Sequence, residues 1–473
     1  MKPRATVFRP YGNAGAIAVS PAQVGLHRPA VRRGSSVDAS STVHGLIEAA
    51  IVGLMLLAVM ALLCLSSSML TNLKVHYVTS GGIFLEKVHL ASYCVFAAFF
   101  LCLIRHGKPI EDLLASLAGA RLTIVLFLCW IALFSQIVIL KRPFTTIIDS
   151  FLLPPMICLV IWQLNASQRR VLAWAFHAGI LLNVILGYYE YFSGHRLIPL
   201  TVGNILVLGE WRSAALLGHP LTASGLIAAY VMALLVRPAI LPKPVRLPVI
   251  AVCFVSLMVF GGRTALIATL AVMACLFGWK ALRFAFGSRV SLVGIIMAMC
   301  LASLIVGAAV VAFDSGIFDK MLLRFSSDKG SALARYATLH LLSYLDWTEL
   351  LLGADPDRIT GLQSQLGLNY GIENFWVSCI TQFGLVHTVL MTIGLGCFFT
   401  DLTRKSDRGV WAIYFLMVMI AAGSVSFSSK NIQMAQFVVL ITLLLPKERR
   451  RAETLQLRSV KPSPRFEPVH ATR

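Results

Sequence analysis

The chain has 473 residues, of which 58% are hydrophobic and only 13% are charged. A soluble domain carries about a quarter charged residues, so this composition excludes a water-soluble enzyme. The formal net charge of +20 could suit a nucleic-acid-binding protein. The distribution of charge argues against nucleic acid as a partner, because the basic residues gather at the two ends and in every second segment between apolar runs.

Apolar runs recur along the whole chain, and a run of about 17–25 apolar residues crosses a bilayer as a helix. The sequence therefore predicts an all-α polytopic membrane protein with about 12 transmembrane helices. The fourth, seventh, eighth and twelfth runs are short. The predicted spans are 45–68, 86–104, 122–140, 146–164, 171–192, 220–236, 247–261, 264–279, 290–312, 376–400, 410–428 and 431–446.

The positive-inside rule orients these spans. When both termini are placed in the cytoplasm, most of the 41 Lys and Arg residues fall on the cytoplasmic side. Residues 1–43 are expected to be a disordered basic cytoplasmic tail rather than a signal peptide, and 447–473 a second basic tail. Residues 44–446 form the predicted transmembrane domain. Its two large periplasmic loops are 193–219 and 313–375.

The second of these loops is long enough to be functional rather than structureless. Within it, residues 331–345 place small or apolar side chains at a helical spacing, with Tyr336, His340 and Ser343 on the opposite face. The pattern predicts a helix, and one that lies on the membrane surface is compatible with it.

Neither a metal nor a cofactor is expected. All ten cysteines lie within or at the edges of apolar runs and form no CxxC, so they are interpreted as small core hydrophobes. No carboxylate or histidine cluster has metal-ligand spacing. Asp355-Pro356-Asp357 is interpreted as a polar turn.

Charged groups within an apolar protein are costly and often mark a site. Arg212 precedes the sixth span and offers a planar guanidinium suited to phosphate oxygens. His219 stands before Pro220, a predicted first-turn proline, and so at a helix N-terminus that favours anions. The alternative is an arginine that reaches the lipid headgroups and a histidine that only caps the helix.

Two further places carry candidate arginines. Gly261-Gly262-Arg263-Thr264 joins two apolar spans, and its glycines allow a tight reversal and a close approach to a ligand. The alternative for Arg263 is contact with headgroups. Arg324 and Arg335 lie in the long loop, where a solvated helix face or an ion pair is the alternative.

The segment that enters the tenth span carries the candidate general base. Glu373 is the last carboxylate before an apolar helix, where partial desolvation suits it to accept a proton. Its alternative role is a helix-N-terminal acid. Tyr370 and Asn374 are neighbouring candidates for substrate binding. Lys430, between the last two spans, is interpreted as a turn charge, and His177 as a satisfied buried histidine.

In this order, the motifs resemble those of the O-antigen ligase and Wzy-type polysaccharide polymerase superfamily, and especially of its VpsF-like exopolysaccharide members. The resemblance covers roughly residues 145–446. Ligases of the superfamily carry a histidine where this chain has Glu373, which favours a polymerase. The likeness rests on Arg212 with Gly218-His219-Pro220, on Gly262-Arg263-Thr264-Ala265-Leu266, and on Ser331, Arg335, Leu351-Leu352-Gly353-Ala354, Glu373-Asn374-Phe375-Trp376 and Gly384.

The resemblance implies a GT-C-like architecture in the bacterial inner membrane, with one long periplasmic loop. It implies a metal-independent inverting glycosyltransferase that moves glycan from a polyprenyl-diphosphate-linked oligosaccharide to a lipid-linked repeat unit. Glu373, Arg263 and Arg212 would be catalytic. The implied substrate-binding residues are His219, Arg335, Arg324, Asn374 and Tyr370.

The expected partners are the lipid bilayer, a chain-length regulator and a flippase. Two alternatives remain open. One is a ligase that attaches finished glycan to lipid A or protein. The other is a transporter or flippase of lipid-linked oligosaccharide, a class in which twelve spans are typical but internal repeats are also common.

Overall fold

The computed structural model describes residues 36–79, 81–199, 201–202, 205–206, 212–237, 241–286, 303, 331–368, 371–423, 427 and 430–447. The chain divides into two compact units, residues 1–45 and residues 46–473. The description below concerns the second unit, which contains every described candidate residue.

The described chain is built from helices, with one antiparallel pair of two-residue strands, β1 (Thr201–Val202) and β2 (Ile205–Leu206). Five of the described helical segments are long and apolar enough to cross a membrane. A sixth is obtained if α3 (Leu90–Ile104) and α4 (Pro109–Ala118), bent by 113°, count as one. The five are Val43–Cys64 of α1 (Ser36–Cys64), Thr145–Gln163, α8 (Ala166–Ser193), Arg263–Arg283 of α11 (Arg263–Ala285) and α17 (Phe375–Lys405).

The other apolar helices of the described chain are shorter. They are α5 (Thr123–Ile139), α9 (Pro220–Val236), α10 (Lys243–Phe260), α18 (Val410–Gly423) and α19 (Gln433–Leu444). Helices thus occupy eleven of the predicted spans, and the span 290–312, apart from residue 303, lies outside the described residues. Twelve crossings are not confirmed, because a 12-residue helix such as α19 is only ~18 Å long and a hydrocarbon core is about 30 Å thick.

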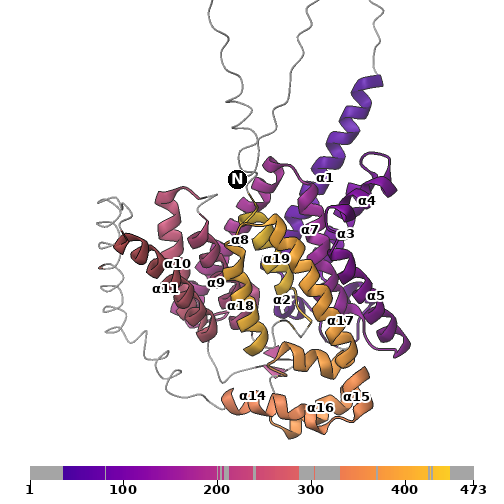
Figure 1. Cartoon of the computed structure of the whole chain (residues 1–473), viewed down its shortest axis with the longest axis vertical. Helices are drawn as coiled ribbons and strands as arrows, with labels where there is room; N and C mark the ends of the chain where they lie inside the picture. Colours follow the sequence, from indigo (N-terminus) through magenta and orange to yellow (C-terminus); the bar gives the residue numbers. More distant parts are fainter. Residues whose placement is uncertain are drawn as a thin grey trace, which may run out of the picture. The chain divides into compact units, whose positions relative to one another are not determined.

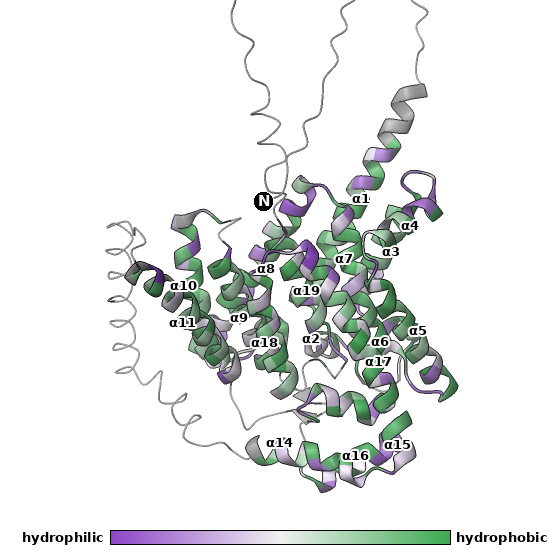
Figure 2. Ribbon diagram, in the orientation of Figure 1, coloured by the Kyte–Doolittle hydropathy of each residue, from purple (hydrophilic) through white to green (hydrophobic). Residues whose placement is uncertain are grey.

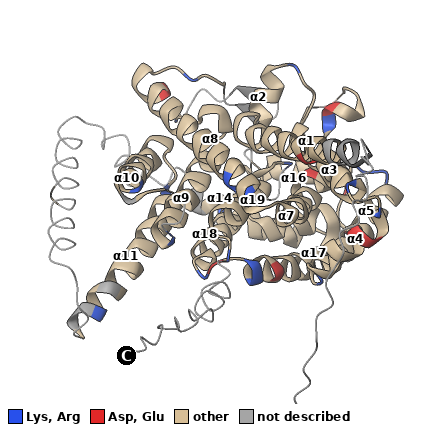
Figure 3. Cartoon of the chain, turned by 90° about the horizontal axis from the view of Figure 1, so that it is seen from above, with Lys and Arg blue, Asp and Glu red and all other residues tan. Residues whose placement is uncertain are grey.

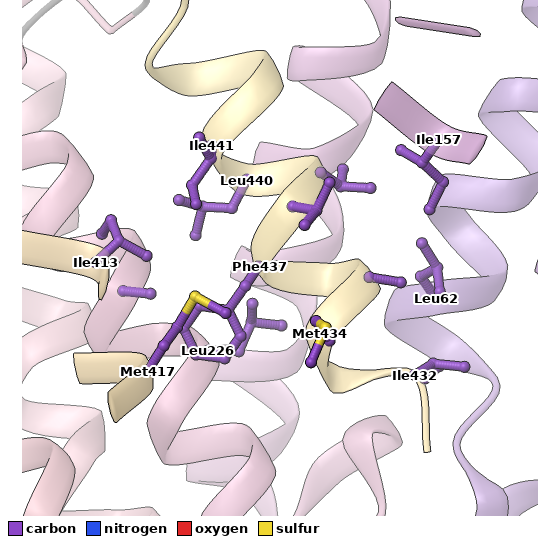
Figure 4. Packing of buried hydrophobic residues seen from close by; sticks show 14 of the residues in the cluster. Leu62, Ile157, Leu226, Ile413, Met417, Ile432, Met434, Phe437, Leu440 and Ile441 are labelled. Atoms are coloured by element: carbon purple, nitrogen blue, oxygen red, sulfur yellow. The ribbon is translucent and has the colours of Figure 1, made fainter. Parts of the chain in front are cut away.

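Two of these short helices form the core of the bundle. All residues of α19, and those of α9 from Ala223 to Leu234, are buried. Phe437 and Ile441 of α19 lie among side chains of α9 and α18, including Leu226 and Met417 (Figure 4). A helix that is apolar on all sides is buried on all sides, and in this fold the covering elements are other helices (Figure 2).

Contacts between helix ends agree with helices that alternate in direction. At one end, Glu48 of α1 bonds to Arg105 after α3 at 2.9 Å and to Gln168 of α8 at 2.7 Å. Asp401 of α17 accepts from the backbone N–H of Thr123 in α5 at 2.9 Å. All these residues lie in predicted cytoplasmic segments or at the predicted cytoplasmic ends of spans. We call the opposite end, which carries the predicted periplasmic segments, the outer end.

The long loop contains a small helical layer, of which the sequence predicted only the helical stretch within 331–345. It comprises α14 (Ser331–His340), the 3-10 helix η4 (Leu341–Tyr344), α15 (Trp347–Leu352) and α16 (Pro356–Gln365) (Figure 1). The predicted stripe of α14 turns inward, while Tyr336, His340 and Ser343 are exposed. The layer has its own core of Leu341, Ala354, Ile359, Leu368, Ile372 and Val377.

A break in α17 fixes this layer to the bundle. Gly384 interrupts the helix with φ 82° and ψ 163°. Arg142, which follows α5, donates to Gln382 O at 2.7 Å and to Gly353 O at 3.2 Å. The N–H of Ala354 donates to Thr381 O at 3.0 Å. The Leu351–Ala354 segment and Gly384, two separate motifs in the sequence, therefore meet in the fold.

The π-helical turn η2 (Ile148–Leu152) lies between α6 (Thr145–Ile147) and α7 (Leu153–Gln163).

Charged side chains are sparse along these helices (Figure 3). Because a buried charge is costly, the few that are buried are considered individually below.

Candidate functional site

The segment that carries Arg212 is held by a buried carboxylate. Glu190, fully buried near the outer end of α8, accepts hydrogen bonds from the N–H groups of Leu197 at 2.8 Å, Ala214 at 2.8 Å and Ala215 at 3.0 Å. Asn183 of α8 accepts from the N–H of Leu216 at 3.1 Å. The backbone beyond Arg212 is therefore fixed against α8. The sequence alone had given Glu190 no special role.

A second arginine joins Arg212. Nε of Arg196 donates to the backbone oxygen of Arg212 at 2.8 Å. Arg196 was not predicted as a site residue, although it lies in the same outer segment, 193–219, as Arg212. Burial lowers the pKa of Arg196, and the charge of Glu190 opposes this shift. The guanidinium of Arg196 thus lies against the backbone of Arg212, and the charges of both arginines act on His219.

His219 occupies the predicted position at a helix N-terminus. It is the N-cap of α9, with Pro220 in the first turn, and its Nδ1 accepts from the N–H of Leu221 at 3.3 Å. Burial and the positive charges of Arg212 and Arg196 lower the pKa of His219 to about 4. The imidazole is therefore neutral near pH 7. Since Nδ1 accepts, Nε2 carries the hydrogen and can donate.

The turn before Arg263 is as tight as the sequence predicts. Gly261 ends α10 at φ 68°, and Arg263 is the first residue of α11. A Cβ on Gly262 would overlap the hydroxyl of Ser224, in the second turn of α9. The close approach that was expected toward a ligand is thus made to α9. It brings Arg263 to the same helix end that His219 caps.

Arg335 of α14 is exposed. One of its terminal nitrogens lies 3.8 Å from where a Cβ on Gly423 would be, at the last residue of α18. Helix α18 packs against both α9 and α11. Arg335 therefore lies at the outer end too, on a neighbouring helix. Arg324 and Tyr370, two further candidates, lie outside the described residues.

Glu373 and Asn374 lie at the start of α17. The side-chain oxygen of Asn374 accepts from the N–H of Val377 at 3.1 Å and caps α17, which gives Asn374 a structural role. Glu373 precedes it and is half-buried. Phe375 is buried against Phe151 of η2, with ring centroids 6.4 Å apart. The described contacts thus place Arg212, His219 and Arg263 near the start of α9, and the two residues after Glu373 at the start of α17.

Next to Phe151 lies a buried polar cluster that the sequence did not reveal. Asp149 of η2 is fully buried and accepts from the hydroxyls of Tyr77 at 2.9 Å and Ser92 at 2.6 Å, and from the N–H of His89 at 3.2 Å. Asp149 lies near the start of the fourth predicted span, 146–164, and this position was its only signal in the sequence. π-Helical turns are frequent at functional sites, so this cluster joins the candidates.

Lys430 completes that cluster. Its ammonium donates to Tyr77 O at 2.7 Å, to the hydroxyl of Thr145 at 3.2 Å and to the backbone oxygen of Lys87. It also lies 4.2 Å above the ring of Tyr77. Desolvation lowers the pKa of Lys430 to about 8, against the attraction of Asp149. Lys430 does lie in a turn, as predicted, but its charge links four segments of the outer end.

Several smaller predictions can be compared with the structure. Asp355 caps α16 and accepts from the N–H of Asp357 at 2.9 Å, so Asp355-Pro356-Asp357 is a helix start. His177 is buried, and its Nδ1 lies 2.7 Å from the hydroxyl of Tyr230, but its Nε2 has no hydrogen-bond partner among the described residues, so the predicted satisfied histidine is only half satisfied. The nine described cysteines are free, and Cys275 alone among them is exposed. Within the described ranges, no three His, Cys, Asp or Glu residues are grouped to hold a metal.

No protein-family model, curated protein or solved structure matches this chain. The fold alone defines the class of protein, and only broadly. The described part is helical and contains five or six helices long and apolar enough to cross a membrane. Its particular activity is a matter for proposal, and the resemblance to the O-antigen superfamily remains a prediction from sequence.

Proposed function

We propose that this chain is a polysaccharide polymerase of the bacterial inner membrane. It transfers glycan from a polyprenyl-diphosphate-linked donor to a sugar hydroxyl of a lipid-linked repeat unit on the periplasmic face. One observation carries the proposal: Arg196, Arg212 and Arg263 gather around the N-terminus of α9. The nearby carboxylate of Glu190 is fully buried and already accepts three backbone N–H groups.

This end of α9 suits a diphosphate. Guanidinium groups pair with phosphate oxygens in a planar, bidentate manner, and a helix N-terminus adds a partial positive charge. Neutral His219 can donate from Nε2 without titrating between pH 5 and 8. Fixed donors of this kind stabilise a leaving group most where its negative charge grows, which lowers the barrier to bond cleavage.

The reaction is a single displacement with inversion. The bond between the anomeric carbon and the diphosphate oxygen breaks, and its electron pair goes to the diphosphate. A bond forms between the same carbon and the acceptor oxygen, and Glu373 takes the proton of that hydroxyl. In this scheme the α9 cluster holds the donor, and the η2–α17 contact presents the acceptor to it.

The test is reconstitution in liposomes with lipid-linked repeat units, followed by gel analysis of the polymer. Arg263→Ala and Glu373→Gln should each abolish polymer while the protein remains in the membrane. Arg170→Ala, an exposed arginine near the start of α8, is the matched control and should leave polymer unchanged. Wild-type polymer from either site variant would remove that residue from the mechanism.

The same preparation separates the alternatives. A ligase would attach preformed glycan to lipid A or protein without lengthening it. A transporter would move repeat units across the liposome membrane and form no new glycosidic bond.

A further inference from the structure

The outer layer presents a row of exposed rings. Tyr336 is 72% exposed, His340 is exposed and Tyr344 is 45% exposed, at successive intervals of four residues along α14 and η4. The rings of Tyr336 and His340 are nearly parallel at 19°, with centroids 6.1 Å apart. Those of His340 and Tyr344 meet edge to face at 5.1 Å. We call these three residues the aromatic ladder.

Hydrogen bonds hold the side chains of the ladder in place before any ligand binds. The ring nitrogens of His340 lie 3.2 Å from the hydroxyl of Ser343 and 3.3 Å from that of Tyr344. Arg358 of α16 donates to Tyr344 O at 3.0 Å and pairs with Glu349 at 2.9 Å. Rings held in this way lose little conformational freedom when a ligand covers them, which favours binding.

We propose that the aromatic ladder binds the growing glycan, an inference that rests on the proposed polymerase function. Sugar rings have apolar C–H faces and hydroxyl edges. Phenol and imidazole rings match both, since their faces are apolar and their edges form hydrogen bonds. The ladder extends over roughly 12 Å of helix, enough for about two linked sugar rings.

The position of the ladder fits this occupant. Arg335, the residue before Tyr336, lies beside Gly423 at the outer end of α18, and α18 packs on α9. A glycan held at its lipid-linked end near α9 would therefore pass the start of the ladder.

A lipid surface is the competing occupant, because Leu333 and Leu339 are exposed on the same helix. A membrane-surface helix directs its apolar stripe into lipid. In α14 the stripe of Ala334 and Ala337 instead packs on the layer's own core with Leu341. The outward face carries polar rings that bond to one another beside these two leucines, and the hydrogen-bonding edges of the rings favour glycan.

The test uses the full chain in nanodiscs and three probes: cellohexaose, chitohexaose and mannohexaose. Wild type should bind at least one, measured by calorimetry without donor lipid. The double variant Tyr336→Ala/Tyr344→Ala should weaken that binding about tenfold, which corresponds to about 1.4 kcal/mol for the loss of the two rings. Tyr336→Phe/Tyr344→Phe keeps the rings and should retain most of it. The control is Trp411→Ala, which removes an exposed aromatic of α18.

Absence of binding to all three probes, or equal losses in the ladder and Trp411 variants, would overturn the inference. A contact between the ladder and lipid would also overturn the inference, and the variant Tyr336→Trp tests for it. The fluorescence of the new tryptophan should be quenched by acrylamide in water and not by brominated lipid. If the protein binds glycan through the ladder but does not polymerise repeat units, the proposed function is refuted and glycan binding by the ladder stands. If it polymerises normally but the ladder binds no glycan, the ladder inference is refuted and the proposed function stands.

Discussion

Replacement of Gly384 by alanine tests the joint between the outer layer and the bundle. Gly384 breaks α17 with φ 82° and ψ 163°, a conformation that is open almost only to glycine. An added Cβ would overlap the carbonyl oxygen of Leu351 and lie 2.6 Å from the N of Gly353. Both obstacles are backbone atoms, so neither can rotate away.

The cost can be worked out from these two effects. A backbone conformation disfavoured for alanine costs about 1–3 kcal/mol. Overpacking against neighbours that cannot move costs about 1–3 kcal/mol more. Gly384→Ala should therefore lower the free energy of unfolding by about 2–6 kcal/mol, a large part of the roughly 5–15 kcal/mol that a folded protein has.

The assay is thermal unfolding in detergent, followed by circular dichroism, together with limited proteolysis of residues 331–372. Gly384→Ala should unfold at a lower temperature and expose this layer to protease. Gly396→Ala is the control, because Gly396 lies in the same helix with nothing within 4 Å of its added Cβ. That change should be neutral or stabilise by up to about 1 kcal/mol. Equal unfolding temperatures for Gly384→Ala and wild type would refute the reasoning.

Three further changes test the outer end. Glu190→Gln replaces an acceptor of three backbone N–H groups by an amide with one acceptor, and should destabilise by about 1–3 kcal/mol in denaturant titrations. Glu111→Gln, on exposed α4, should change stability by less than about 0.5 kcal/mol. The pKa of Lys430 is lowered from 10.5 to about 8 in the folded state, so between these two values the unfolded state binds more protons at this group than the folded state does. The contribution of Lys430 to stability should therefore rise between pH 8 and 10.5. Lys430→Met should remove this rise, and a variant that keeps the wild-type pH profile would contradict the assignment. Gly262→Ala should push α11 from α9 and weaken donor binding although Arg263 is retained, whereas Gly278→Ala, with nothing near its Cβ, should not. Equal donor affinities in the two glycine variants would show that the α9–α11 spacing is unimportant.

The sequence predicted best what local rules control. His219 before Pro220 is a helix-start pattern and becomes the N-cap of α9. Gly261 and Gly262 produce the predicted tight turn, and the spacing of residues 331–345 correctly separates the buried and exposed faces of α14. Each of these outcomes depends on neighbours within one or two helical turns.

The sequence failed where the decisive partner is distant. Asp149 bonds to Tyr77 and Ser92, 72 and 57 residues away, and no local pattern distinguishes it from an ordinary acid at a span end. The predicted count of crossings is not confirmed, for a related reason. Hydropathy does not tell whether protein or lipid surrounds an apolar helix, and α9 and α19 are enclosed by protein.

The shortness of α19 bears directly on the proposed chemistry. Its last turn is tied to the end of α17, because Leu445 O accepts from Asp407 N and Lys405 O accepts from Lys447 N. From that level α19 rises only ~18 Å, whereas a hydrocarbon core is about 30 Å thick. Its first residue, Gln433, should therefore lie below the outer membrane surface, beside Gly225 of α9. If the proposed diphosphate binds at that depth, its attraction to the arginines near α9 would be screened less than in water, which is what the proposed chemistry requires.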